Sequence, residues 1–148
     1  MKKYDLGSSK GEAFATEMAV ANTLAVTTAN GGISAAVDEF GGQSVAVAMG
    51  KDAKAITADG GFAAVAAGFM GWAVACRQAT AVAITKAETG DYGVAISRAW
   101  VRGGEGSILV CFDADGFPHV ATVSQDGIRP GVWYTWDGRW RAAGDPEK

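Results

Sequence analysis

One phrase recurs nine times in this sequence, as in Thr23-Leu24-Ala25-Val26, Ser44-Val45-Ala46-Val47 and Gly93-Val94-Ala95-Ile96: a small residue, any residue, Ala, and usually Val or Ile. Copies begin about every ten residues, and Gly, Asp, Asn or Thr separates many of them. The other six copies are Ala13-Phe14-Ala15-Thr16, Ser34-Ala35-Ala36-Val37, Ala53-Lys54-Ala55-Ile56, Ala63-Ala64-Val65-Ala66, Ala73-Val74-Ala75-Cys76 and Ala81-Val82-Ala83-Ile84.

Each phrase has the alternation of a short β-strand, because successive side chains of a strand point to opposite faces. The first and third positions are small, and the second and fourth are more often large, so each strand has one thin and one bulky face. Burying a Val or Ile side chain contributes about 1.5–3 kcal/mol. We therefore expect the Val and Ile faces to fill the interior and Ala to line the outside.

Strands this short must stack on their neighbours to bury an apolar face. The residues between them, such as Gly41-Gly42, Asp59-Gly60-Gly61 and Gly90-Asp91, tolerate the backbone of tight corners. The sequence predicts an all-β fold: a parallel β-solenoid or β-roll of about nine short strands, with roughly two copies per coil. The alternatives are an Ala-rich helical protein, which the β-branched residues and spacer glycines disfavour, and a sandwich of short strands.

The pattern changes after Ile96, and Gly103-Gly104-Glu105-Gly106 forms the predicted internal boundary. Strands are expected at residues 107–112, 117–124 and 132–136, with turns at 113–116, 125–127 and 137–138. These strands predict an antiparallel β-meander that caps the open end of the solenoid, where exposed strand edges would invite pairing with other chains. The expected organisation is a lead-in at 1–12, solenoid repeats at 13–102 and a C-terminal module at 103–148.

Composition narrows the class of protein. The chain has 148 residues and a formal net charge of -3, which is too mild to indicate nucleic acid or an anionic membrane as a partner. The polar N-terminal segment has no apolar core typical of a signal peptide, and no apolar run reaches a membrane-spanning length. The chain is expected to be cytoplasmic, in the host cytoplasm if phage-encoded, with Cys76 and Cys111 as reduced, partly buried thiols, although a disulfide between them stays open.

No catalytic or metal-binding set emerges. His119 is the single histidine and has no second His or Cys at ligand spacing, so it is interpreted as a surface hairpin residue. Asp113 and Asp115 are interpreted as turn residues, because their segment lacks the closing Glu of a calcium-binding loop. The sequence predicts no enzyme, no metal site and no cofactor.

The candidate binding residues form an aromatic and basic cluster near the end of the chain. Trp, Tyr and Arg dominate binding hot spots, and such a cluster could also stack a base or clamp a phosphate. The alternative is a cap that packs its aromatic rings onto the last coil. The cluster comprises Arg129, Trp133, Tyr134, Trp136, Arg139, Trp140 and Arg141.

These features together resemble a family of uncharacterised phage and bacterial proteins with tandem Ser-Ala-Ala-type repeats and a C-terminal Trp-Tyr-Thr module. The residues that carry the resemblance are the nine repeats, Ile108-Leu109-Val110, residues 113–116, residues 126–130, Trp133-Tyr134-Thr135 and Asp137-Gly138. The repeats here have Val and Ile where members often have Thr and Asn. More distantly, the phrase is similar to the head repeats of trimeric autotransporter adhesins, which form left-handed β-rolls. The resemblance implies a phage or prophage setting and carries over no catalytic residue.

Two functions are therefore expected. The first is a non-enzymatic interaction protein, an accessory or anti-defence factor that binds a host protein, with the C-terminal module as the contact. The alternative is a protein that binds and sequesters a small nucleotide signal at subunit seams. A homo-oligomer, dimer or trimer, is expected from a flat outer strip of Ala that includes Ala36, Ala46, Ala55, Ala75 and Ala83.

Overall fold

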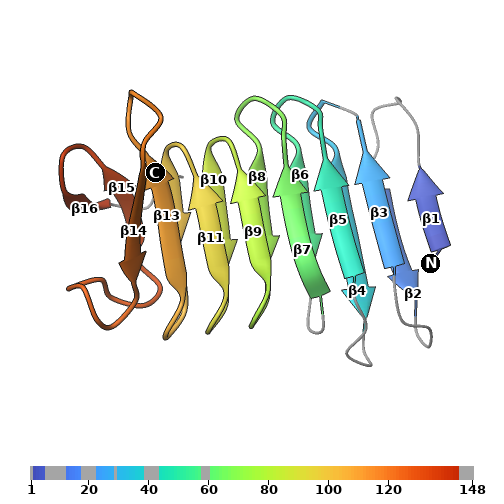
Figure 1. Cartoon of the computed structure of the whole chain (residues 1–148). Coiled ribbons are helices and arrows are strands. Elements are labelled where there is room, and N and C mark those ends of the chain that lie inside the picture. Colours follow the sequence, from blue (N-terminus) through green and yellow to red (C-terminus); the bar gives the residue numbers. More distant parts are fainter. Residues whose placement is uncertain are drawn as a thin grey trace.

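The computed structural model describes residues 2–5, 13–17, 23–28, 30–38, 44–57 and 61–143, which form a β-solenoid without helices (Figure 1). The chain alternates between two sheets of eight strands, so the predicted fold class is confirmed. Sheet A contains β1 (Lys2–Asp5), β3 (Thr23–Thr27), β5 (Ser44–Ala48), β7 (Gly61–Ala66), β9 (Thr80–Ala83), β11 (Val94–Ser97), β13 (Ile108–Phe112) and β14 (Pro118–Thr122). Sheet B contains β2 (Ala13–Glu17), β4 (Ile33–Asp38), β6 (Lys54–Thr57), β8 (Trp72–Ala75), β10 (Lys86–Thr89), β12 (Trp100–Arg102), β15 (Trp133–Trp136) and β16 (Trp140–Ala143).

Each coil contributes one strand to each sheet, which confirms the expectation of two copies per coil. The coils shorten along the chain. The step from Leu24 to its partner Val45 in the next coil is longer than the step from Thr80 to its partner Val94. Strands and corners both contribute to the difference, since β3 and β4 have five and six residues whereas β9 and β10 have four each.

All nine predicted copies overlap strands, and three further strands of the solenoid were not predicted. The first, β1, lies in the expected lead-in and pairs in parallel with β3. The other two, β10 and β12, pair in parallel with each other in sheet B. Their sequences, Lys-Ala-Glu-Thr and Trp-Val-Arg, keep a small or apolar residue between polar or aromatic ones, so they do not match the phrase.

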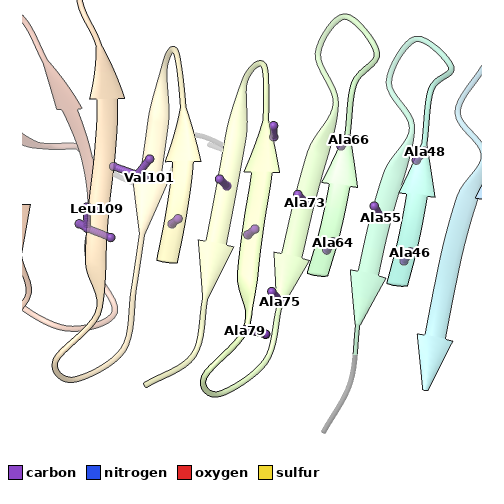
Figure 2. Packing of buried hydrophobic residues seen from close by; sticks show 14 of the residues in the cluster. Ala46, Ala48, Ala55, Ala64, Ala66, Ala73, Ala75, Ala79, Val101 and Leu109 are labelled. Carbon is purple, nitrogen blue, oxygen red and sulfur yellow. The ribbon is translucent and has the colours of Figure 1, made fainter. Parts of the chain in front are cut away.

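The predicted orientation of the strands is wrong. Alanine fills the space between the sheets (Figure 2). Most Val and Ile side chains of the repeats lie on the outer faces, where they are half-buried. In β6, for example, Ala55 is fully buried while Ile56 is partly exposed. The supposed outer strip is therefore the core, with exposed fractions of 0–7% at Ala36, Ala46, Ala55, Ala75 and Ala83.

Short corners explain why alanine takes the interior. Only two residues, Ile84 and Thr85, connect β9 to β10, and only Arg98 and Ala99 connect β11 to β12. Three Cα–Cα steps span at most about 11 Å when fully extended, and less around a corner. Sheets that carry ordinary side chains pack about 10 Å apart. Corners this short favour a close approach of the two sheets, at which methyl groups fit between them and branched side chains do not.

Larger residues enter the interior towards the C-terminal module. In sheet A the inward position held by Ala95 in β11 is held by Leu109 in β13, and both are fully buried. In sheet B the corresponding sequence runs from Ala87 through Val101 to Tyr134. The interior therefore accommodates larger side chains at this end of the solenoid.

Successive corners are stacked by hydrogen bonds. The Tyr92 N–H donates to Glu105 O at 2.8 Å, and Asp91 Oδ1 accepts from the Glu105 N–H at 2.9 Å. Tyr92 has a φ of 55°, a left-handed conformation that non-glycine residues seldom adopt. The expected use of Asp in such positions is confirmed at Asp52, whose φ is 56°.

The C-terminal module caps both sheets rather than forming one meander. Strand β13 pairs in parallel with β11, so the solenoid continues past the expected boundary at residue 103. Strand β14 then pairs antiparallel with β13 and ends sheet A. Strand β15 crosses to sheet B, pairs antiparallel with β12 and is followed by antiparallel β16 (Figure 1). The expected antiparallel strands are confirmed, and each sheet receives its own cap.

The two cysteines are thiols rather than a disulfide, as expected. Cys76 is half-buried, and Cys111 is buried beneath the cap. Burial raises the pKa of the Cys111 thiol, which makes it a poor nucleophile. Among the described residues, no helix is long and apolar enough to span a membrane.

Candidate functional site

The outer face of sheet A carries two uninterrupted ranks of outward side chains that cross seven strands, from β3 to β14. The second rank is entirely β-branched, and neither rank includes a charged residue. The first rank is Leu24, Val45, Ala63, Thr80, Val94, Ile108 and Thr122. The second rank is Val26, Val47, Val65, Val82, Ile96, Val110 and Val120. We call these fourteen residues the apolar face.

The side chains of the apolar face lie on the outside of the solenoid because alanine occupies most inward positions of the same strands. Its side chains are half-buried by their neighbours in the sheet, and the exposed fraction reaches 40% at Ile108 and 61% at Val120. Cross-strand neighbours in such ranks cover one another's sides and leave their tips open to solvent. This side of the solenoid is therefore a mainly apolar surface, with Thr80 and Thr122 as its polar members.

The outer face of sheet B has a different chemistry. Four outward residues in consecutive strands are in register: Lys54 in β6, Trp72 in β8, Lys86 in β10 and Trp100 in β12. Cation and indole alternate from strand to strand, and we call this row the Lys-Trp ladder. The Lys54 ammonium lies 4.1 Å from the Trp72 ring centroid, and the Lys86 ammonium lies 5.5 Å from it.

A second rank runs beside the ladder and consists of Ile56, Val74, Glu88 and Arg102. Arg102 Nη2 lies 2.6 Å from Glu88 Oε2, and its guanidinium lies 4.6 Å from the Trp133 ring centroid. Two buried donors on this face have no hydrogen-bond partner in the described part of the chain, Trp72 Nε1 and Arg102 Nε. The Trp72 indole contacts Lys54 and Lys86, and the Arg102 guanidinium contacts Trp133.

The seven predicted binding residues do not form one surface. Trp133 is 4% exposed, contacts Trp72 edge to face at 6.5 Å, and therefore belongs to the sheet B face. Tyr134 is also 4% exposed and points inward, where its hydroxyl accepts a hydrogen bond from the Arg129 N–H at 2.9 Å. These two residues support the cap in the free chain.

Of the remaining predicted residues, the two tryptophans pack against each other and the three arginines are exposed. Trp136 and Trp140 are half-buried and meet edge to face at 5.6 Å. Arg141 is exposed and lies 2.6 Å from Asp137. Arg129 and Arg139 are exposed as well, so the three arginines are the predicted residues open to a partner.

His119 lies in the β13–β14 hairpin, as predicted, and is half-buried there. Its ring stacks on Trp136 with centroids 3.9 Å apart, and its Nε2 lies 2.8 Å from Asp113 Oδ2. This stack joins the cap strand of sheet A to that of sheet B. A side chain that pairs the two caps has a structural role.

Asp113 organises the turn between β13 and β14. Its Oδ1 accepts hydrogen bonds from the N–H groups of Asp115 and Phe117, which confirms the interpretation of the segment as a turn. The hydrogen bond with His119, followed by the one from Phe117, holds the pKa of the Asp113 carboxyl below its usual value. Over the described residues, no group of three His, Cys, Asp or Glu side chains could hold a metal ion.

The Lys-Trp ladder was not predicted, because its residues are distant in sequence and form no local motif. The intervals from Lys54 to Trp72, from Trp72 to Lys86 and from Lys86 to Trp100 are the lengths of the coils that separate these residues. Residues separated by the lengths of successive coils lie in one row, so these three intervals together indicate the ladder.

Comparison of the chain with protein-family models, with curated proteins and with solved structures found no match.

Proposed function

We propose that this chain is a non-enzymatic interaction protein that associates with a second copy of itself through the apolar face of sheet A. The observation that carries the proposal is the pair of uncharged ranks across seven strands. A contiguous apolar surface of this extent is comparable to the largest patch on a typical monomer, and such patches often mark interaction sites. We therefore still propose a homo-oligomer, but its interface consists mainly of Val and Ile side chains instead of alanines.

The size of the apolar face suits a dimer. Seven strands spaced about 4.8 Å apart, each four to five residues long at about 3.3 Å per residue, give roughly 500 Å². Two such faces packed together would bury about 1,000 Å², which is the lower limit for a specific interface. A smaller ligand would leave most of this apolar surface in water.

The chemistry of the apolar face favours a second copy as its occupant. The ranks offer methyl groups in a regular array and few polar groups that could specify a different partner. A two-fold axis would place each rank against a rank of the same kind, which gives a closed, self-complementary interface. Sheet B and the cap would then face outward in both copies.

The proposal includes a host protein of a phage or prophage as the partner of the assembled dimer. Polar contacts for such a protein are available at the cap, where Arg129, Arg139 and Arg141 are exposed. Arginine is among the residues that dominate binding hot spots. The cap would therefore determine which host protein binds, and the dimer would carry two copies of the cap.

Light scattering at micromolar concentration tests the self-association. The wild-type protein is expected to have twice the mass of a single chain. Val82 lies in the middle of the second rank, so Val82→Lys would bury an unpaired ammonium group in the dimer. We expect this variant to weaken dimerisation by at least about ten-fold, equivalent to about 1.4 kcal/mol.

The matched control is Val74→Lys, which places the same charge on a half-buried outward position of sheet B. This variant should remain dimeric, and circular dichroism should show that both variants keep their strands. A monomeric wild type, or a Val82→Lys variant that dimerises normally, would refute the proposed interface.

A further inference from the structure

We propose that the Lys-Trp ladder on sheet B binds a linear acidic polysaccharide in which acidic and neutral sugar rings alternate. This inference concerns the face opposite to the apolar face and does not depend on self-association. It rests on the order of the side chains, on their spacing, and on the charge that the ladder leaves unpaired.

The spacing of the ladder fits a polymer that runs across the strands. Adjacent strands lie about 4.8 Å apart, which is close to the length of one pyranose ring in an extended chain. A polysaccharide along the solenoid axis would place one ring over each of β6, β8, β10 and β12. The alternation of Lys54, Trp72, Lys86 and Trp100 would then meet an acidic ring and a neutral ring in turn.

The positive charge of the ladder is available for an anion. No carboxylate among the described residues forms a salt bridge with Lys54 or Lys86, whereas the neighbouring Glu88 is engaged by Arg102. The two ammonium groups lie 4.1 Å and 5.5 Å from the centroid of the same indole, which limits the distance between them to about two strand spacings. Carboxylates on every second ring of the polymer would recur at about that same distance.

The indoles supply the apolar half of the recognition. The C–H groups on one face of a neutral sugar pack well on an aromatic ring, and Trp combines a large apolar surface with a polar N–H. Trp100 is half-buried and its indole makes no ring, cation or hydrogen-bond contact with the described residues, so its exposed surface is open. Lys54, Lys86 and Trp133 already contact the Trp72 ring, so Trp72 positions the two ammonium groups and Trp100 supplies the open indole surface.

The arrangement fits single-stranded nucleic acid less well. Each nucleotide carries its phosphate beside its base, so stacking sites in a nucleic-acid interface need a row of cations next to a row of aromatic rings. The rank next to the ladder is Ile56, Val74, Glu88 and Arg102, of which two are apolar and one is acidic. Cations and indoles here lie in one line, which is the order of an alternating polymer.

Isothermal titration calorimetry with hyaluronan octasaccharides tests the proposal, because glucuronate and a neutral amino sugar alternate in this polymer. Binding is expected to the wild-type chain and to weaken as salt is added. The double variant Lys54→Ala with Lys86→Ala should weaken it at least ten-fold, and Trp100→Ala should weaken it several-fold. Lys51→Ala is the matched control, because Lys51 is exposed at a corner outside the ladder, and it should bind normally.

Comparison ligands separate the alternatives. Neutral dextran should bind far more weakly than hyaluronan, and so should oligo(dT). Absence of hyaluronan binding, equal binding of dextran, or binding that persists in the double lysine variant would overturn the proposal. Tighter binding of oligo(dT) that is lost in the same variant would overturn it in favour of a nucleic-acid interface. The Val82→Lys variant should bind hyaluronan normally per chain, so failure of the dimer and failure of the ladder can be distinguished.

Discussion

Gly68→Ala is expected to lower the free energy of unfolding by about 3 kcal/mol or more, a large effect for one methyl group. Gly68 lies in the corner between β7 and β8, stacked on the corner of the preceding coil. A Cβ atom there would overlap the Gly50 carbonyl oxygen and lie 2.6 Å from its carbonyl carbon. Both neighbours are backbone atoms, so a whole corner must shift. For a chain of this size the melting temperature should fall by roughly 6–12 °C.

Gly116→Ala is the control for this prediction. Gly116 has a φ of 87° in the turn between β13 and β14, and a Cβ atom there would meet nothing within 4 Å. The substitution should cost only the backbone strain of a left-handed residue, about 1–2 kcal/mol. Thermal unfolding followed by circular dichroism measures both. If Gly68→Ala were no more destabilising than Gly116→Ala, the close stacking of the corners would be wrong.

Ala64→Leu is the second substitution with a large expected effect. Ala64 is fully buried between the sheets, in a row of alanines that runs through Ala46 and Ala81. Ala64 and its row neighbours are already fully buried, so three added carbon atoms have no space. Overpacking typically costs about 1–3 kcal/mol and occasionally more, and we expect about 3 kcal/mol here.

Ala63→Leu makes the same chemical change at the adjacent position of β7. Ala63 points outward and is partly exposed, so the longer side chain extends over the outer face. Both variants are made in the Val82→Lys background, in which the proposed dimer is weakened, and there the free energy of unfolding of Ala63→Leu, from urea denaturation, should stay within about 0.5 kcal/mol of that background, as for most surface substitutions. Equal destabilisation by both variants, or a stable Ala64→Leu variant, would contradict the inward orientation of Ala64.

The strands of the solenoid could be predicted because their signal is local. Alternation within four residues and turn formers between the copies identified all nine repeats. Strands β10 and β12 were not predicted, because their outward positions hold Lys, Glu, Trp and Arg rather than Val or Ile. Only the inward Ala87 and Val101 mark them, and these are recognised once the coil length is known.

Which face of each strand points inward could not be predicted from burial energies alone. Transfer of Val and Ile out of water favours the bulky face, as we expected. The decisive quantity is the distance between the sheets, which depends on corners as short as Ile84-Thr85. A corner of two residues favours the thin face as the inward one in the coils that contain it.

The candidate site depends on contacts between coils, which is why the sequence showed only part of it. The aromatic cluster at the C-terminal end was visible because its members are close in sequence. The structure separates that cluster, placing Tyr134 in the interior and Trp133 against Trp72 and Arg102. Lys54 and Trp100 are far apart in sequence but belong to one row.

Thiol labelling tests the central claim, that small side chains lie inside and large ones outside, most directly. In a Cys76→Ser background, Ala73→Cys and Val74→Cys place a thiol on either side of β8, with circular dichroism to confirm the fold of each variant. Ala73 is fully buried and Val74 is partly exposed. The account predicts that native Val74→Cys reacts with iodoacetamide at least ten-fold faster than native Ala73→Cys, and that both react alike when unfolded. Faster labelling of Ala73→Cys in the native state would show that the alanines face outward and would contradict the account.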